Sequence, residues 1–354
     1  MKRIGILYDK SSKKVFLLPN EVKQLTQQGV MVNIPCGLGF CIGINDNEYI
    51  AAGAKVYPEW QAVINSSDVL LKVNAFNKTE LALMKNKIAI TMVNYLANVD
   101  MLYFMLENKV TGLEWCSLND RNGFVLFPEI EETKAPLIMH YVKSAIAKGL
   151  ATRAKDKVSY PKEPSMLILN ATFAGVALAK QALASGFKVT LADNDTKYLV
   201  SLKKSSGLKD LDFVDANFET LVEQIKTKNV FVNTAINPTD LTKLRITKDM
   251  IQSMPKGSMA IDAACEYGYA FHFIKKYADK QLKWNKLDKS YYMAHEDITN
   301  LAGKEVSQII SSKSVKYLLD VIKQGTDNSV IWKITNCQGG KVVNSTINSK
   351  LHLY

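Results

Sequence analysis

The amino-acid sequence predicts an α/β protein made of two doubly wound, Rossmann-like parallel-sheet domains that are joined by long helices. In the first 115 residues, short apolar runs alternate with amphipathic segments, and the same alternation resumes between residues 166 and 262. This alternation is typical of parallel sheets that are covered by helices on both faces. Helical periodicity from about Glu131 to Ala154, and again from Glu305 to Lys323, predicts the long helices.

Each predicted element rests on a short stretch of sequence. In the first region, apolar runs predict strands at Arg3–Leu7, Val30–Ile34, Val69–Val73, Ile88–Val93 and Thr111–Trp115. Amphipathic segments between them predict helices at Glu21–Gln28, Thr79–Lys85 and Val99–Asn108. The turn-rich stretch Asn119–Gly123 predicts a hairpin or a domain boundary. In the second region, strands are predicted at Met166–Leu169, Lys188–Leu191, Val230–Asn233 and Met259–Ile261.

Composition restricts the class of protein. The 354 residues suffice for two domains with separate cores, and 47% apolar and 22% charged residues are ordinary for a globular chain. No apolar run approaches the roughly 20 residues that span a bilayer, and the start MKRIGILYDK lacks the apolar stretch of a secretory signal, so we expect a cytoplasmic protein without a membrane partner. The net charge is +11, but the lysines are spread out without interleaved aromatic residues, so a nucleic-acid partner is not expected.

The five cysteines are scattered and form no Cys-x-x-Cys pair. An odd number with this spacing argues against a zinc site or a disulfide framework, and we expect no metal. The apolar surroundings predict buried, reduced thiols at Cys36, Cys41, Cys116, Cys265 and Cys337.

Residues 166–195 have the strand–turn–helix–strand pattern of a dinucleotide-binding unit, but with an altered phosphate turn. At the positions of the three glycines of the usual turn, this sequence has Asn170, Thr172 and Gly175. Asparagine tolerates the unusual backbone angles of the bend, whereas the branched Thr172 either crowds a phosphate or donates its hydroxyl to it. The alternative is a doubly wound domain whose turn binds nothing.

The second strand of this pattern ends at Asp193, which lies 18 residues after Gly175. A carboxylate at this place accepts hydrogen bonds from the ribose hydroxyls and repels a 2′-phosphate. It therefore favours NAD as the cofactor, with NADP as the alternative. The other candidate cofactor-binding residues are Ala174 in the turn, and Ala235 and Ile236 after the strand Val230–Asn233.

Four segments of the sequence resemble one protein family. They are MKRIGILYDKSSKKVFLLPNEVKQLTQQGV at the start, CGLGFCIGINDNEYIAAGAKV (36–56), SSDVLLKVN (66–74) and MPKGSMAIDAACEYGYAF (254–271). In order and spacing they resemble the alanine dehydrogenase/pyridine nucleotide transhydrogenase family, which includes saccharopine dehydrogenases and N5-(carboxyethyl)ornithine synthases. The resemblance implies a split substrate domain (1–122 and 298–354), a dinucleotide-binding Rossmann domain (123–297) and a homo-oligomer.

The resemblance also implies substrate residues, and most of them depart from the family's pattern. Lys14 stands where relatives have the arginine that pairs with the substrate carboxylate, and it keeps the charge without the bidentate fork. Asn74 replaces the second lysine of Lys-Val-Lys, and Lys72 matches the first. Because successive strand residues point to opposite faces, Lys72 either takes part in catalysis or faces away from the site. Asn94 replaces the acid–base histidine and cannot carry a proton near pH 7.

Two further segments offer a replacement for the lost proton carrier. The resemblance aligns Glu266 with the aspartate of Asp-x-Ala-x-Asp, where it acts as an acid–base or ribose-contacting group. The segment AHEDITN (294–300) matches the one that lines the nicotinamide in relatives, which implies that His295 and Asp297 lie at the cleft. His295 either replaces the lost imidazole or is a surface residue in a polar loop.

Two functional hypotheses follow. In the first, the protein is an NAD(P)-dependent amino-acid dehydrogenase, or one of the opine and saccharopine type. It transfers hydride to or from an amino acid or 2-oxo acid in the interdomain cleft. The catalytic residues would be Glu266, His295 and Lys72, and the substrate would contact Lys14, Asn74, Asn94 and Asp297. In the second hypothesis, the loss of the histidine and lysine marks a catalytically inactive relative with a binding or interaction role.

Overall fold

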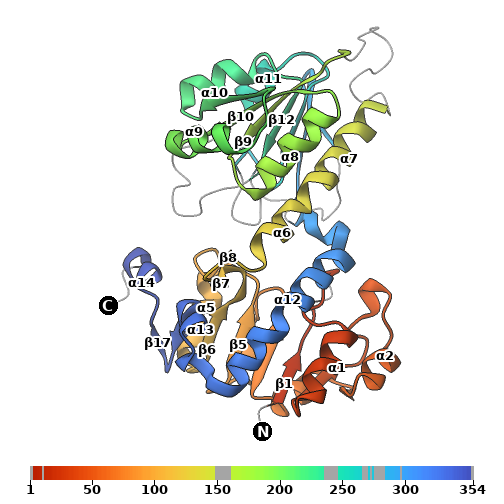
Figure 1. Ribbon diagram of the computed structural model, residues 1–354, viewed down its shortest axis with the longest axis vertical. Helices are drawn as coiled ribbons and strands as arrows, with labels where there is room; N and C mark the ends of the chain where they lie inside the picture. The colour runs from red at the N-terminus through yellow and green to blue at the C-terminus, as the bar shows by residue number, and fades with distance from the viewer. Residues whose placement is uncertain are drawn as a thin grey trace. The chain divides into compact units, whose positions relative to one another are not determined.

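A computed structural model of the chain describes residues 3–9, 12–147, 161–234, 246–264, 270, 271, 273, 274, 284–295 and 297–351. The chain forms two units, which are unit 1 (Met1–Ile130 with Asn300–Tyr354) and unit 2 (Glu131–Thr299). Each unit has its own mainly parallel sheet flanked by helices (Figure 1), which confirms the predicted fold class. The units divide after Ile130 and Thr299, whereas the sequence analysis set the limits at 122 and 297.

Unit 1 contains a sheet with the strand order β17-β16-β6-β5-β4-β1-β2-β3. The parallel strands are β1 (Arg3–Ile6), β2 (Met31–Pro35), β3 (Lys55–Tyr57), β4 (Val69–Lys72), β5 (Ile88–Thr91) and β6 (Thr111–Glu114). Beyond β6, the sheet continues with β16 (Thr335–Gln338), which is antiparallel to β6, and ends with β17 (Lys341–Val342), which is antiparallel to β16. The strand order reverses between β1 and β4, and doubly wound sheets bind ligands outside the carboxyl ends of strands at such a reversal.

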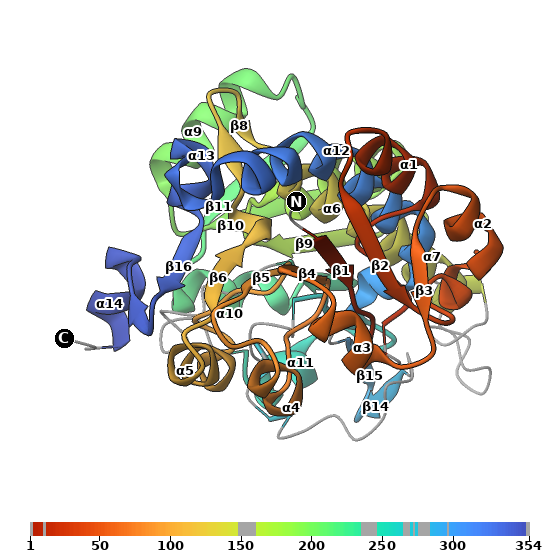
Figure 2. The same cartoon turned by 90° about the horizontal axis from the view of Figure 1, so that it is seen from below.

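Helices cover both faces of this sheet (Figure 2). On one face lie α1 (Pro19–Gln27) and α12 (Gly303–Gln324), and on the other α3 (Trp60–Asn65), α4 (Lys78–Ala82) and α5 (Val99–Glu107). The unit also contains α2 (Asp46–Ala51), α13 (Ser329–Lys333) and α14 (Ser345–Leu351).

Helix α12 holds the N-terminal segment that contains Lys14. The Ser307 hydroxyl accepts a hydrogen bond from the backbone N–H of Val15 at 2.9 Å, and the Ser311 hydroxyl accepts one from that of Leu18 at 2.8 Å. Side chains of both segments join one hydrophobic core. Segments from opposite ends of the sequence therefore build unit 1 together.

Unit 2 contains a sheet with the strand order β11-β10-β9-β12-β13-β15-β14. The parallel strands are β9 (Ser165–Leu169), β10 (Lys188–Asp193), β11 (Leu211–Asp215), β12 (Val230–Asn233), β13 (Met259–Asp262) and β15 (Ser290–Ala294), and β14 (Asn285–Leu287) is antiparallel to β15. The helices are α7 (Lys134–Ala147), α8 (Phe173–Ala184), α9 (Thr196–Ser205), α10 (Phe218–Ile225) and α11 (Lys248–Ser253). This sheet reverses its order between β9 and β12, as the sheet of unit 1 does between β1 and β4.

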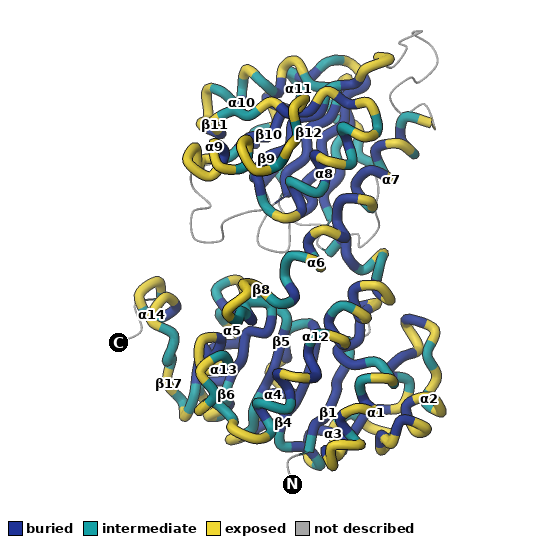
Figure 3. Tube along the Cα trace, viewed as in Figure 1, coloured by how far each residue is buried: buried dark blue, intermediate teal, exposed yellow. Residues whose placement is uncertain are grey.

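The central strands of both sheets are buried (Figure 3): β4 and β12 along their whole length, and β1 and β9 at every residue but the first. They are the strands that the apolar runs predicted, because burial on both faces favours apolar side chains. The predicted hairpin at Asn119–Gly123 is confirmed, since β7 (Asn119–Asp120) pairs with β8 (Gly123–Phe124).

Two predictions of the sequence analysis need correction. The helix expected from Glu131 to Ala154 is divided into α6 (Phe127–Glu132) and α7, which begins at Lys134, and residues 148–154 lie outside the described part. The thiols were expected to be buried, but Cys36 and Cys41 are exposed because they lie in the loop after β2. Cys116 is half-buried, and Cys337 is buried as expected.

Among the residues that the structure describes, no helix combines the length and the apolar character needed to cross a bilayer.

Candidate active site

The turn after β9 has the backbone shape of a dinucleotide turn, with asparagine in place of the first glycine. Asn170 has a φ of 74°, the left-handed conformation that glycine usually provides. Its backbone N–H donates to the carbonyl oxygen of Ala192 at 2.7 Å, and its Nδ2 donates to Oδ1 of Asn233 at 3.1 Å. These contacts tie the turn to β10 and β12 on either side and hold the strained residue in place.

Gly175, the surviving third glycine, is required by close packing. A Cβ at this position would overlap the carbonyl oxygen of Asn170, so only glycine lets α8 approach the turn this closely. The residue predicted between them, Ala174, is buried in the first turn of α8. The turn therefore keeps the helix packing that brings the N-terminus of α8 to the strand end.

Thr172 is the N-cap of α8, and its hydroxyl makes hydrogen bonds within the turn. Its Oγ1 accepts from the backbone N–H of Gly175 at 3.2 Å and lies 3.2 Å from Oγ1 of Thr234. The Thr234 hydroxyl has two carbonyl oxygens, those of Leu169 and Asn170, within 3.0 Å. Since carbonyl oxygens only accept, Thr234 donates to them and Thr172 donates to Thr234. The Thr172 hydroxyl is therefore engaged in capping and turn contacts.

Asp193, at the end of β10, also binds the turn. Its Oδ2 accepts from the backbone N–H of Ala171 at 2.7 Å, and its Oδ1 accepts from that of Asp195 at 2.9 Å. A carboxylate has about four acceptor positions, so each oxygen retains capacity for a further donor. Asp193 thus lies where a ribose-binding carboxylate would lie, at the carboxyl end of the second strand.

A buried polar network, which the sequence analysis missed, continues along the same edge of the sheet. Nδ2 of Asn233 donates to Oδ1 of Asp262 at 2.8 Å, and Oδ2 of Asp262 accepts from the backbone N–H of Ala270 at 2.9 Å. Burial raises the pKa of Asp262, and its hydrogen bonds from Asn233 and backbone N–H groups oppose that change. The available signal was a polar residue at the end of each of two adjoining apolar strands.

His295 follows β15 on this edge and is half-buried. Its backbone N–H donates to the carbonyl oxygen of Asp262 at 3.1 Å, and its Nδ1 accepts from the backbone N–H of Asp297 at 2.9 Å. Because Nδ1 accepts, the proton of the neutral imidazole lies on Nε2. Oδ1 of Asp297 accepts from the Thr299 hydroxyl at 2.6 Å.

Three predicted site residues, Ala235, Ile236 and Glu266, lie outside the described residues.

In unit 1, the predicted lysines are both buried. Lys14 follows Ser12, whose Oγ accepts from the Lys14 backbone N–H at 3.2 Å. The ammonium of Lys72 lies 2.9 and 2.8 Å from the two carboxylate oxygens of Glu80, and Oε2 of Glu80 also accepts from the backbone N–H of Asn77 at 2.8 Å. This bidentate ion pair favours the interpretation in which Lys72 faces away from a substrate.

The side chain of Asn94 makes hydrogen bonds within its own loop and with Glu114. Its Oδ1 accepts from the backbone N–H groups of Leu96 and Ala97 at 2.9 and 3.2 Å, and its Nδ2 donates to Oε1 of Glu114 at 3.3 Å. The buried Glu114 carboxylate also accepts from Nδ2 of Asn336 at 2.9 Å. Asn74, the other residue at a substrate position, is half-buried just beyond β4.

The structure therefore brings the predicted residues together in two groups, one in each unit. Asn170, Thr172, Ala174, Gly175 and Asp193 surround the turn at the β9/β12 reversal. Lys72, Asn74 and Asn94 lie at the carboxyl ends of the neighbouring strands β4 and β5. In the described part of the chain, no group of three or more His, Cys, Asp or Glu side chains could hold a metal ion.

Comparison with known proteins gives two family-model matches. The model "alanine dehydrogenase/PNT, N-terminal domain" matches residues 9–127, and the corresponding C-terminal domain model matches residues 146–345. The chain is 24% identical to an alanine dehydrogenase of Methanococcus maripaludis, over 97% of this chain and 94% of the relative. It is 23% identical to alanine dehydrogenase 1 of Staphylococcus aureus, over 95% of this chain and 92% of the relative.

Solved structures show the same fold. An L-alanine dehydrogenase superposes with a TM-score of 0.80 at 17% identity, covering 99% of both chains. A transhydrogenase from Sinorhizobium meliloti superposes with a TM-score of 0.75 at 18% identity, covering 97% of this chain and 100% of the other. With both family models matched along the sequence, the chain belongs to the alanine dehydrogenase/PNT family.

Proposed function

We propose that the protein is an NAD(H)-dependent oxidoreductase that transfers hydride between the nicotinamide and an amino acid or its 2-oxo acid. One observation carries the proposal, namely the intact shape of the turn after β9. Asn170 supplies the left-handed residue and Gly175 the close approach of α8, so the turn keeps its form despite its altered sequence. Both features are those that the phosphate turn of a dinucleotide-binding unit uses.

The residues present fit a dinucleotide. The N-terminus of α8 would face the pyrophosphate, and the backbone N–H of Ala174 makes no hydrogen bond within the described residues. Asp193 would accept from the ribose hydroxyls and disfavour a 2′-phosphate, which makes NAD the preferred cofactor over NADP. When bound, the dinucleotide would supply the hydride.

The substrate end of the proposal rests on the family resemblance. Lys14 would pair with the substrate carboxylate, with Asn74, Asn94 and Asp297 as further contacts. Glu266 or His295 would carry the proton that Asn94 cannot. For Lys72 we propose a bracing role through Glu80 instead of proton transfer.

A second candidate function is a catalytically inactive relative with a binding role. The observation that favours it is Asn94, whose side-chain oxygen and nitrogen are both used inside the loop at the position of the family's histidine. The two candidates differ in whether turnover accompanies nucleotide binding.

Fluorescence titration with NADH and NADPH, followed by turnover assays with 2-oxo acids plus ammonia or primary amines, tests the proposal. We expect saturable NADH binding and NADPH binding weaker by about tenfold. Asp193→Asn should reduce this preference, whereas the exposed Asp212→Asn in the neighbouring strand should not. Nucleotide binding without turnover on any acid would favour the inactive relative, and absence of nucleotide binding would refute the proposal.

A further inference from the structure

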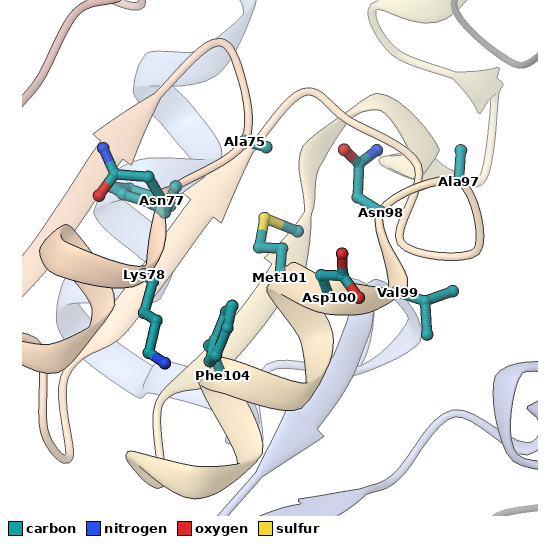
Figure 4. A pocket seen from close by; sticks show the side chains of 10 residues that line it. Ala75, Asn77, Lys78, Ala97, Asn98, Val99, Asp100, Met101 and Phe104 are labelled. Atoms are coloured by element: carbon teal, nitrogen blue, oxygen red, sulfur yellow. The ribbon is translucent and has the colours of Figure 1, made fainter.

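The strand ends of unit 1 contain an open pocket of about 490 Å³, between the segments 75–78 and 97–101 (Figure 4). These segments follow Asn74 and Asn94 in the sequence, so the pocket belongs to the substrate side of the proposed function. The strand ends of unit 2 contain a feature that the proposed function leaves unexplained. Asn170 brings a side chain to a position where a phosphate turn normally has glycine.

Three polar side chains form a row across the carboxyl ends of β9, β12 and β13. Asn233 pairs with Leu169 of β9 on one side and with Asp262 of β13 on the other, and Asn170 follows Leu169. Nδ2 of Asn170 donates to Oδ1 of Asn233 at 3.1 Å, and Nδ2 of Asn233 donates to Oδ1 of Asp262 at 2.8 Å. The side chain of Asn170 is therefore directed to the end of β12.

Asp262 sets the direction of the hydrogen bonds in this row. Its Oδ1 accepts from the backbone N–H of Ala264 at 3.3 Å, and its Oδ2 accepts from that of Ala270 at 2.9 Å. An amide side chain can be turned to exchange its oxygen and nitrogen, but Asn233 faces an acceptor in Asp262 and therefore presents its NH2 group there. The carbonyl oxygen of Asn233 is thus left for Asn170.

Burial makes this arrangement costly to break. Asn233 and Asp262 are almost completely buried, whereas Asn170 is half-buried. A buried carbonyl oxygen that loses its donor pays the cost of its desolvation, so Oδ1 of Asn233 favours the conformer of Asn170 that reaches it. Without this acceptor, the side chain of Asn170 has three staggered χ1 positions available.

We propose that Asn233 is a positioning residue for the dinucleotide, which acts by holding the side chain of Asn170 against β12 and so keeps the phosphate turn open. The turn lies at the β9/β12 reversal, outside the strand ends where doubly wound sheets bind dinucleotides. A released side chain of Asn170 would stand in the place of the pyrophosphate. The inference rests on the proposed function for its ligand, and it explains how a turn without the first glycine remains usable.

Fluorescence titration of the full chain with NADH tests this role through a rescue. In Asn233→Ala, a side chain spread over three χ1 positions leaves about one third of the molecules open, so NADH affinity should fall about threefold or more. Asn170→Gly has no side chain to hold and should bind NADH within about twofold of the wild type. The double variant Asn170→Gly/Asn233→Ala should regain that affinity, which loss of a purely structural contact would not allow.

Asn229→Ala is the matched control, because Asn229 joins the same two strands at their amino ends. Its Oδ1 accepts from the backbone N–H of Ser165 at 2.9 Å. This variant should bind NADH like the wild type. Wild-type affinity in Asn233→Ala, or a loss that Asn170→Gly does not restore, would overturn the proposal. If the alanine variant does not fold, Asn233→Ser takes its place, because serine is too short to bridge both neighbours.

Urea denaturation without nucleotide tests the contact itself. Asn170→Gly should shift the urea midpoint more favourably when residue 233 is already alanine, because the hydrogen bond is then already lost. Equal shifts in both backgrounds would overturn the proposal even if the wild type binds NADH. Absence of NADH binding in every variant would refute the proposed function and the role of Asn233 toward a dinucleotide. Unequal shifts would then still show that Asn233 holds Asn170, so the two failures are distinguishable.

Discussion

Substitutions of Asn170 test whether the turn after β9 needs a residue that tolerates the left-handed backbone conformation. Asn170→Ala puts an ordinary residue at a φ of 74° and removes the hydrogen bond to Asn233, whereas Asn170→Gly removes only the hydrogen bond. A left-handed conformation costs a non-glycine residue roughly 1–2 kcal/mol. We therefore expect the alanine variant to be less stable than the glycine variant by about this amount in urea denaturation. Equal stability of the two variants would mean that the turn relaxes to another conformation.

Asp262 makes stability depend on pH. Because burial raises its pKa in the folded chain, the folded state binds the proton more tightly than the unfolded state. Its contribution to the free energy of unfolding is therefore full below the ordinary value of 3.8 and is lost as the pH rises through the raised pKa. A tenfold difference in proton affinity corresponds to about 1.4 kcal/mol.

The variant Asp262→Asn lacks this titration, so the stability of the wild type relative to the variant should fall as the pH rises from about 4 and then level off. Urea denaturation at a series of pH values measures the difference, with the exposed Asp212→Asn as the control. A relative stability that rises over the same range would show that Asp262 is better stabilised as the anion.

Lys72 of β4 and Glu80 of α4 form a buried ion pair that joins these two elements, and its contribution to stability can be measured. Glu80→Gln keeps a residue type suited to the capping box but leaves the Lys72 ammonium buried without a counter-charge. Breaking a buried pair in this way costs about 3–5 kcal/mol, which urea denaturation can measure. The double variant Lys72→Met/Glu80→Gln removes the uncompensated charge and should recover much of the loss. A single variant as stable as the wild type would show that the pair does not brace the loop.

The sequence revealed the central elements and missed the edges for a physical reason. Strands such as β12, which reads Val-Phe-Val-Asn, are mostly apolar because they are covered on both faces. By contrast, β11 at one edge reads Leu-Asp-Phe-Val-Asp, and β16 beside the edge strand β17 reads Thr-Asn-Cys-Gln. Such polar strands at or beside the edge of a sheet are specified by their neighbours, which periodicity along the chain does not show.

The site residues also divide into those that a local sequence pattern indicates and those that it does not. Asn170 and Gly175 could be predicted because their spacing within one turn carries the signal. Asn233, Thr234 and Asp262 were missed, because each acquires its role from a partner more than 25 residues away along the chain.

The two units arrange their parallel strands in the same way. The parallel strands run in the order β3-β2-β1-β4-β5-β6 in unit 1 and β11-β10-β9-β12-β13-β15 in unit 2, so each sheet has one reversal with ligand-binding potential. Local periodicity predicted both sheets, but only the family resemblance indicated that the C-terminal segment returns to the first unit. The expected homo-oligomer stays a prediction.

If the turn after β9 binds a dinucleotide, NADH will protect its backbone, and hydrogen–deuterium exchange of the full chain with and without NADH measures that protection. Backbone N–H groups of 172–175, in the turn and the first residues of α8, and those of 193–195, after β10, should exchange more slowly with NADH. NADPH at the same concentration should protect them less. If NADH binds but leaves both segments unprotected, or if it protects no part of unit 2, the turn after β9 is not the dinucleotide site.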